Sequence, residues 1–296
     1  MVIYAGGAKP SKGSSGGGGG GSSTKYGVSF DSLLGDVDEN GVYQRSTEEF
    51  DFVGGSIKDV ADYALCYEFC LNPGVKTVSF PDLTKVSGEY ACQYSFGECP
   101  NLTSVDMSSL TEVSGYYGGR EMFTSCSKLT SVNLSNLTTI SGYYGCYSMF
   151  DQCSKLTSVN LSNLTTISGG GACAYMFRCR ALTSIDLSNL TTVSGSSDCQ
   201  YMFGECFYLT SIDLSNLTTI SGYNACQNMF YRCSRLPTIS FPKLQEINTN
   251  ALNNMFNGCT ALTEIHFRAD MQATVEALTG YSSKFGASKA TIYFDL

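Results

Sequence analysis

Fourteen cysteines give this 296-residue chain its greatest apparent capacity for chemistry, because thiols form disulfides and bind zinc. Two registers contain most of them: Cys99, Cys126, Cys153, Cys179, Cys206, Cys233 and Cys259 in one, and Cys92, Cys146, Cys173, Cys199 and Cys226 in the other. An odd-numbered register cannot pair completely within itself. Two cysteines seven positions apart on a helix would lie about 10 Å apart, beyond the reach of a disulfide. We therefore predict a structural ladder of small buried thiols, with oxidation between exposed neighbouring rungs as the alternative.

Other reactive groups are sparse. No Cys-x2-Cys pair occurs, and His266 is the sole histidine, so the sequence predicts no zinc site. It contains no nucleophile elbow, phosphate loop or metal triad. We therefore predict a protein that is not an enzyme and has no catalytic residue, metal or cofactor. His266 has no evident partner in the sequence and is interpreted as a surface or packing residue.

Two recurring polar patterns suggest chemistry but have simpler explanations. The outward-facing positions of the predicted strands form a column of serine with an acidic or amide residue: Ser104/Asp106, Ser131/Asn133, Ser158/Asn160, Ser184/Asp186 and Ser211/Asp213. Such a column could attract a cation, but without a glycine-rich metal loop it is typical of the polar face of a half-exposed sheet. Asn-Leu-Thr glycosylation motifs begin at Asn136, Asn163, Asn189 and Asn216, and we interpret them as by-products of a repeat.

One loop in each repeat varies while its neighbours stay fixed. After a Ser-Gly pair the chain reads Tyr-Tyr-Gly, Gly-Gly-Gly, Ser-Ser-Asp or Tyr-Asn-Ala. Tyr, Gly, Ser and Asn are favoured in adaptable binding surfaces, where tyrosine provides contact area at a low entropic cost. The sequence therefore predicts ligand-binding residues here: Tyr116, Tyr117, Tyr143, Tyr144, Tyr223 and Asn224. A tolerant surface loop that varies without selection is the alternative.

These positions belong to a unit of about 27 residues that opens at Val75, Leu102, Leu129, Leu156, Leu182, Leu209, Leu236 and Leu262, in steps of 27, 27, 27, 26, 27, 27 and 26. A fixed period in this range is typical of a stacked solenoid. In the unit from Leu129, the alternation around Val132 predicts a short strand with Ser131 and Asn133 facing outward. The Cys-x-x-Met-Phe-x-x-Cys segment predicts a short helical turn.

The junction Phe150-x-x-Cys153-x-x-Leu156, followed by a Leu-x-x-Val opening, resembles that of the BspA-like leucine-rich repeat proteins. The same frame recurs at Phe96, Phe123, Phe203 and Phe230, and the copy at Phe177 is one residue shorter. The resemblance implies a repeat solenoid, a stack of short parallel β-strands with short helical turns. It also implies a bacterial surface protein. The family's secreted members carry signal peptides, whereas no such segment is evident here, and the Ser-Gly-x-x-x-Cys insertion lengthens the coil.

The composition along the chain predicts four parts. Residues 1–25 form a flexible Gly/Ser-rich leader with a short apolar start, Val2–Ala5. Residues 26–64 form an N-terminal β cap, in which Val28, Phe30 and Phe50–Val53 alternate like strands. The repeats occupy residues 65–265, and residues 266–296 form a C-terminal α/β cap. That cap has a helix over Ala269–Gly280 and a final strand over Ala290–Leu296.

The composition also restricts the partners. A net charge of −8 argues against binding nucleic acid or anionic membranes. No apolar run is long enough to span a membrane, and the N-terminus has no apolar signal segment. We expect the cell surface by a non-classical route, the virion, or the cytoplasm if neither applies. The oligomeric state is open.

Three functions are compatible with these features. The first is a recognition and adhesion module of a bacterial surface-type protein, which binds a protein or glycan surface. The second is a phage or prophage virion component, such as a tail-tip or fibre protein. The third is a structural spacer without a ligand.

Overall fold

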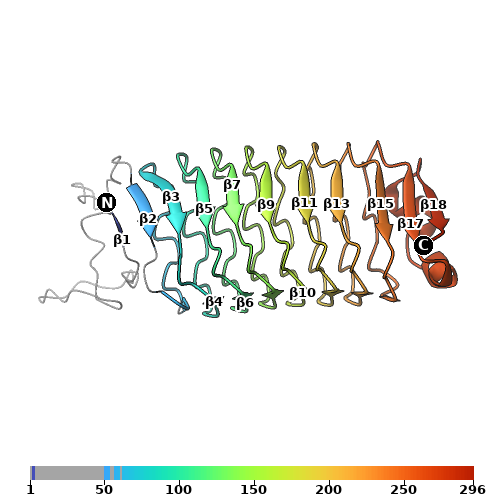
Figure 1. Ribbon diagram of the computed structural model, residues 1–296, viewed down its shortest axis with the longest axis horizontal. Coiled ribbons are helices and arrows are strands. Elements are labelled where there is room, and N and C mark those ends of the chain that lie inside the picture. The colour runs from blue at the N-terminus through green and yellow to red at the C-terminus, as the bar shows by residue number, and fades with distance from the viewer. Residues whose placement is uncertain (1, 4–49, 54–56, 61) are drawn as a thin grey trace, which may run out of the picture.

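The protein is an elongated parallel β-solenoid in which each repeat forms one coil (Figure 1). The structure, a computed structural model, describes residues 2–3, 50–53, 57–60 and 62–296. An eight-stranded sheet contains β1 (Val2–Ile3), β2 (Phe50–Val53), β3 (Val75–Ser79), β5 (Ser104–Asp106), β7 (Ser131–Asn133), β9 (Ser158–Asn160), β11 (Ser184–Asp186) and β13 (Ser211–Asp213). The predicted stack of short parallel strands is confirmed.

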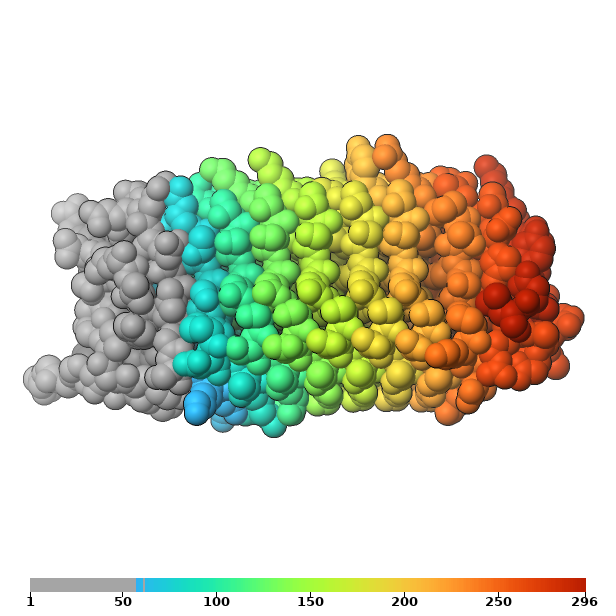
Figure 2. Space-filling view, in the orientation of Figure 1, coloured from blue at the N-terminus to red at the C-terminus, as the bar shows by residue number. Residues whose placement is uncertain are grey.

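A second, seven-stranded sheet was not predicted. It contains β4 (Lys85–Val86), β6 (Glu112–Val113), β8 (Thr139–Ile140), β10 (Thr166–Ile167), β12 (Thr192–Val193), β14 (Thr219–Ile220) and β16 (Glu246–Ile247). Equivalent residues of successive coils pair in register, as Thr139 does with Thr166. Equivalent side chains therefore line up along the body, in which successive coils follow one another from the N-terminal to the C-terminal end (Figure 2).

The return segment of each coil is a run of overlapping turns and not the helix that its spacing predicted. Every second N–H donates to the neighbouring coil, as Cys92 N–H does to the Gly118 carbonyl (2.7 Å). The intervening N–H groups close turns to the residue three positions earlier, as in Gln93 to Tyr90 (3.2 Å). Residues with positive φ recur within the run. In this conformation the backbone hydrogen bonds of a helix are replaced by turn hydrogen bonds and by hydrogen bonds to the neighbouring coil. The latter connect successive coils along the stack.

Stacked phenylalanines fill the core. The row runs through Phe69, Phe96, Phe123, Phe150, Phe177, Phe203, Phe230 and Phe256, all fully buried, with centroids of successive rings 5.1–5.8 Å apart. Offset stacking at this separation is favourable. Because each ring packs against rings of the coils on either side, one coil cannot bury its apolar face alone.

The glycine of each Ser-Gly pair is required by close packing between coils. A Cβ on Gly142 would lie 2.2 Å from the carbonyl oxygen of Gly115, and a Cβ on Gly115 would lie equally close to that of Gly88. The backbone cannot yield to such a contact, so larger residues are excluded here. The fixed Ser-Gly pair thus sets where the variable loop of each coil begins.

The final coil departs from the repeat. Strands β15 (Thr238–Phe241), β17 (Glu264–Phe267) and β18 (Thr291–Phe294), which come from successive turns at the C-terminal end, pair in parallel as a separate three-stranded sheet. Between β17 and β18 lie η1 (Ala269–Met271), α1 (Gln272–Glu276) and η2 (Tyr281–Gly286). The helix predicted over Ala269–Gly280 is thus shorter and begins as a 3-10 turn, and the strand predicted over Ala290–Leu296 covers Thr291–Phe294. At the other end, β2 confirms the strand predicted at Phe50–Val53, and β1 pairs with it in parallel. Val28, Phe30 and most of the predicted leader and N-terminal cap lie outside the described residues.

Candidate functional site

The cysteine ladder lies inside the stack of coils. All fourteen cysteines are buried. In the predicted seven-membered ladder each thiol donates to a phenylalanine carbonyl of the preceding coil, as Cys153 Sγ does to Phe123 O (3.2 Å) and Cys206 Sγ to Phe177 O (2.7 Å). Burial raises the pKa of Cys153 to about 12, which suppresses the reactive thiolate at neutral pH. The predicted buried thiols are confirmed, although the helix used to argue against disulfides is absent.

The acidic and amide residues that end each strand also have local partners. Asp213 Oδ1 accepts the Ser215 N–H (2.8 Å), and Asn133 Oδ1 accepts the Ser135 N–H (3.2 Å). These Asx turns are the ordinary way such side chains end a strand. Within the part of the chain that the structure describes, no group of three or more His, Cys, Asp or Glu side chains could hold a metal ion. No helix among these residues has the length and apolarity needed to cross a membrane.

His266, which had no evident partner in the sequence, lies between two acids. Its Nδ1 is 2.9 Å from Asp295 Oδ1 and its Nε2 is 3.4 Å from Glu264 Oε2. Its ring stacks on Tyr293 at 4.9 Å. Burial lowers the pKa of His266, but the hydrogen bonds to Asp295 and Glu264 outweigh it and hold the pKa above its usual value. The pairing of β17 with β18 creates this contact across 29 residues.

Four of the predicted ligand-binding residues form one cluster. Tyr116 and Tyr143 stack at 5.4 Å, and Tyr117 and Tyr144 stack at the same centroid distance. The two rings of each Tyr-Tyr pair meet edge to face at 4.4 Å. Tyr116 and Tyr143 are 44% and 45% exposed, and their partners are half-buried. We call Tyr116, Tyr117, Tyr143 and Tyr144 the tyrosine cluster.

The backbone holds the tyrosine cluster in a fixed geometry. The Tyr117 N–H donates to the Tyr143 carbonyl (2.9 Å), and both Tyr117 and Tyr144 have positive φ. A side-chain hydrogen bond to Tyr117, together with burial, raises the pKa of Tyr116 to about 12. The hydroxyl of Tyr116 therefore stays protonated at neutral pH and can donate as well as accept hydrogen bonds.

The cluster ends at the three glycines of the next coil. A Cβ on Gly171 would lie 2.4 Å from the Tyr144 ring, and one on Gly170 would lie 3.1 Å from the Tyr143 ring. Both glycines also have positive φ, so a larger residue would be strained as well as crowded. Tyr223 and Asn224 stand two coils beyond these glycines. Tyr223 is 57% exposed, and Asn224 is half-buried with positive φ, so the structure does not bring them into the cluster.

A cation adjoins the tyrosine cluster. The Arg120 guanidinium lies 4.9 Å from the centre of the Tyr117 ring and 5.3 Å from that of Tyr147, within cation–π range. These residues and Tyr144 line a hollow of about 210 Å³. The Arg120 Nε is buried and has no hydrogen-bond partner among the described residues. Arg120 and Tyr147 were not predicted as site residues, because both lie in the return segment interpreted as a helix.

The aromatic row continues beyond the cluster. Tyr147 packs against Tyr175 (5.5 Å), Tyr175 stacks on Tyr201 (5.0 Å), and Tyr201 meets Tyr231 edge to face (5.5 Å). On the other side of the cluster, Tyr90 stacks on Tyr117 at 5.0 Å. The recurrence of a tyrosine in each of these coils was the signal that could have revealed the row.

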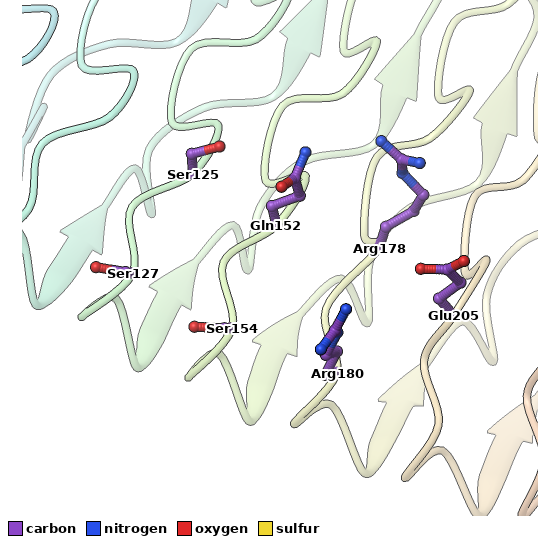
Figure 3. Close-up of a pocket in the computed structure, with 7 residues that line it drawn as sticks. All are labelled: Ser125, Ser127, Gln152, Ser154, Arg178, Arg180 and Glu205. Atoms are coloured by element: carbon purple, nitrogen blue, oxygen red, sulfur yellow. The ribbon is translucent and has the colours of Figure 1, made fainter.

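A second, larger hollow of about 530 Å³ lies near Tyr175. Three successive coils contribute pairs of side chains to it: Ser125 with Ser127, Gln152 with Ser154, and Arg178 with Arg180 (Figure 3). Glu205 of the following coil completes the lining. Arg178 donates to both oxygens of the buried Asp151, through Nε (2.8 Å) and Nη2 (2.6 Å). The shortened coil is visible in the sequence, but no site was predicted there.

Asp198 is the one fully buried acid in the variable loops of the described coils. Its carboxylate accepts N–H groups from Gly170 (2.7 Å), Ala172 (3.3 Å) and Gly195 (2.6 Å). Burial raises the pKa of Asp198, although these three backbone donors favour its ionised form. The residue thus satisfies donors of the glycine-rich coil and belongs to the scaffold.

Comparison with known proteins identifies the repeat. The sequence matches the family profile described as "BspA type Leucine rich repeat region", in six copies over residues 43–170, 93–225 and 149–279. A search of curated protein sequences found no significant match.

Solved structures with a similar arrangement include three from different sources. A leucine-rich repeat protein of T. pallidum has 18% identity and a TM-score of 0.44, with 82% of this chain and 86% of that chain covered. The pneumococcal vaccine antigen PcpA has 16% identity and a TM-score of 0.25, with coverages of 89% and 83%. The Drosophila Toll–Spatzle complex has 15% identity and a TM-score of 0.38, with 83% of this chain and 34% of that chain covered.

The family match spans most of the chain and coincides with the stacked coils, their phenylalanine row and their cysteine ladder. The protein therefore belongs to the BspA-type leucine-rich repeat family.

Proposed function

We propose that this protein is a non-enzymatic recognition module that adheres to a protein or glycan surface through its tyrosine cluster. The fold supports the coarser part of this statement, because a leucine-rich repeat solenoid is typically a scaffold for interaction. The finer part rests on one observation. Tyr116 and Tyr143 expose nearly half of their surface although they are stacked and bonded in place.

Rigid, exposed aromatic rings favour binding for an energetic reason. Ordering a mobile side chain at an interface costs about 0.5–1.5 kcal/mol. In the tyrosine cluster, ring stacking and the backbone hydrogen bond from Tyr117 to Tyr143 already order the side chains in the free protein. Binding therefore needs little further loss of side-chain entropy. The ring edges offer apolar contact, and the hydroxyls offer hydrogen bonds. Arg120 lies beside them and pairs through Nη2 with Glu121 (3.3 Å), so the N–H groups that remain suit a partner rich in hydroxyl or carbonyl groups.

The test uses the full chain, labelled and incubated with candidate host cells and with a glycan panel. In one variant all four tyrosines of the cluster become serine. A milder variant carries only Tyr116→Ser and Tyr143→Ser, the two exposed positions, and keeps the half-buried rings that support the coil. The matched control carries Tyr208→Ser and Tyr223→Ser, which change two exposed tyrosines outside the cluster.

We expect both cluster variants to lose most of the binding and the control to retain it, with circular dichroism unchanged in all three. Equal binding by wild type and both cluster variants would exclude the cluster as the site. Wild-type protein that binds no cell and no glycan would favour the structural spacer.

A further inference from the structure

We propose that the hollow at the shortened coil is a second binding site, which takes one carboxylate-bearing sugar residue and holds its carboxylate with Arg180 and Arg178. It lies apart from the tyrosine cluster and has a different ligand chemistry. The inference rests on the origin of the hollow, its size, its balance of charge and the free polar groups around it.

The hollow exists because one residue is missing. In the regular coils the turn before the ladder cysteine contains a residue of positive φ, namely Ser125, Gln152, Glu205 and Arg232. These positions are 27, 53 and 27 residues apart, so the column skips one coil. In that coil Arg178 directly precedes Cys179, whose N–H turns back to the Phe177 carbonyl (2.5 Å). Arg178 lies on the coil between those of Gln152 and Glu205, and all three line the hollow (Figure 3).

The size and lining suit a small polar ligand. A volume of about 530 Å³ lies within the range of about 300–1,000 Å³ typical of small-molecule sites. Such sites are generally lined by apolar side chains, whereas seryl, amide, guanidinium and carboxylate groups line this one. Its lining therefore selects for a ligand with many hydroxyls and against an apolar ligand.

The charges leave one cation unneutralised. The buried Asp151 pairs with Arg178, and Glu205 lies 3.6 Å from Arg232. Arg180 is exposed, and its guanidinium lies 5.8 Å from the Phe207 ring. Among the described residues it has no acidic partner. One surplus positive charge matches a single carboxylate, and the nearby Glu205 disfavours a dianion such as phosphate.

The remaining groups can recognise sugar hydroxyls. Arg178 uses Nε and Nη2 on Asp151, which leaves Nη1 to join Arg180 on the carboxylate of a ligand. Ser127, Ser154 and the Gln152 amide line the hollow and, within the described residues, their side chains form no hydrogen bond. Together they offer donors and acceptors suited to neighbouring hydroxyls.

The experiment measures binding to the full chain by calorimetry and saturation-transfer NMR. The probes are N-acetylneuraminic acid, glucuronic acid and galacturonic acid, with glucose and galactose as neutral counterparts and inorganic phosphate as the competing anion. Arg180→Ser removes the cation and introduces the residue that occupies the same column at Ser127 and Ser154. Arg180→Lys keeps the charge but loses the planar fork. Arg235→Ser, at an exposed arginine outside the hollow, is the matched control.

We expect at least one acidic sugar to bind the wild type and the Arg235→Ser control equally. Arg180→Ser should weaken binding about ten- to a hundredfold, as expected for a lost charge-assisted hydrogen bond, and Arg180→Lys should weaken it less. A glutamine inserted between Arg178 and Cys179 restores the 27-residue period and should abolish binding while circular dichroism shows an intact fold.

Four results would overturn the proposal: no acidic sugar binds, neutral sugars bind equally well, phosphate binds more tightly than every acidic sugar, or Arg180→Ser binds like the wild type. The tyrosine variants retain Arg178 and Arg180. Failure of either site is therefore measured separately from failure of the other.

Discussion

Two consecutive coils, Leu129–Lys155 and Leu156–Ala181, share one backbone path but differ in what they display. The first is regular: Tyr143 and Tyr144 stand in its variable loop, and Gln152 occupies the positive-φ position before Cys153. The second has three glycines in the loop and lacks a residue before Cys179. Their strands, phenylalanines and cysteines still stack. Stacking therefore tolerates change at two places in the coil, and the candidate sites lie at those places.

The largest effect is expected for Asp198→Ala, which tests whether the glycine-rich coil Leu156–Ala181 depends on the Asp198 carboxylate. Changing Asp198 to alanine leaves three backbone N–H groups without their acceptor. An orphaned buried donor costs about 1–3 kcal/mol, so we expect a loss of about 3 kcal/mol or more in the free energy of unfolding, measured by urea denaturation.

The matched control is Asp213→Ala in a regular coil. Its exposed carboxylate accepts one N–H, that of Ser215, and we expect a loss below about 1 kcal/mol. Equal losses for the two variants would mean that the glycine-rich coil can adopt the regular hydrogen bonds, which would remove the distinction between the coils.

A smaller effect is expected at Arg178. Its removal leaves the Asp151 carboxylate, with only 6% of its side chain exposed, buried without a cation. Breaking a buried pair costs about 3–5 kcal/mol, and because a third of Arg178 is exposed we expect about 2 kcal/mol for Arg178→Ala. Thermal and urea unfolding measure the change.

Arg232→Ala provides the comparison, since its contact with Glu205 is longer (3.6 Å) and its side chain is 55% exposed. A loss below about 1 kcal/mol is expected there. Adding Asp151→Ala to Arg178→Ala should restore part of the stability. A double variant less stable than Arg178→Ala would show that the unpaired carboxylate is not the source of the loss.

The cysteine ladder offers a comparison in which the two coils should behave alike. Cys153 and Cys179 are both fully buried and donate to phenylalanine carbonyls at 3.2 and 3.0 Å. We expect Cys153→Ala and Cys179→Ala each to cost about 1 kcal/mol, from a small void and a weak hydrogen bond. A much larger cost at Cys179 would make the thiol a specific support of the shortened coil. Rapid labelling of most native thiols would contradict their burial.

The sequence predicted the elements that the period imposes. Strand, phenylalanine and cysteine positions recur every 26 or 27 residues, so one interpretation of a coil applies to all coils. The prediction of a helical turn in the return segment was wrong, although the spacing of Cys-x-x-Met-Phe-x-x-Cys is helical. The N–H groups of this segment instead bond to the next coil, a partner that a local pattern cannot reveal. The second sheet was missed because its strands are two residues long.

The candidate sites were predicted only in part. The Tyr-Tyr pairs were visible as a variable loop, but their separation from Tyr223 depends on three-dimensional stacking across the glycine coil. The hollow beside Arg180 follows from one missing residue, which the sequence showed as a step of 26. A missing residue reveals neither the volume it leaves nor the side chains that surround it, because those come from four coils.

The smallest expected effect concerns His266, an irregular position at the exposed end of the stack. Its pKa is held above the usual value in the folded protein, so protonation favours the folded state. This stabilisation is fully present below about pH 6.5, the unfolded value, and is lost as the pH rises through the folded pKa. Because half of the Asp295 side chain is exposed, we expect less than about 1 kcal/mol.

Melting temperatures of the wild type and Asp295→Asn, measured from about pH 5 to about pH 9, test this expectation. The wild type should be the more stable protein at the acidic end, and the two curves should converge as His266 loses its proton. The melting temperature of Asp213→Asn, a position that faces no histidine, should change with pH in parallel with that of the wild type. If the difference in melting temperature between the wild type and Asp295→Asn stays constant or widens with pH, the protonation of His266 does not depend on Asp295. The stability lost on removing a charged side chain would then not depend on how deeply that side chain is buried. Such a dependence is expected in the comparison of Asp198→Ala with Asp213→Ala.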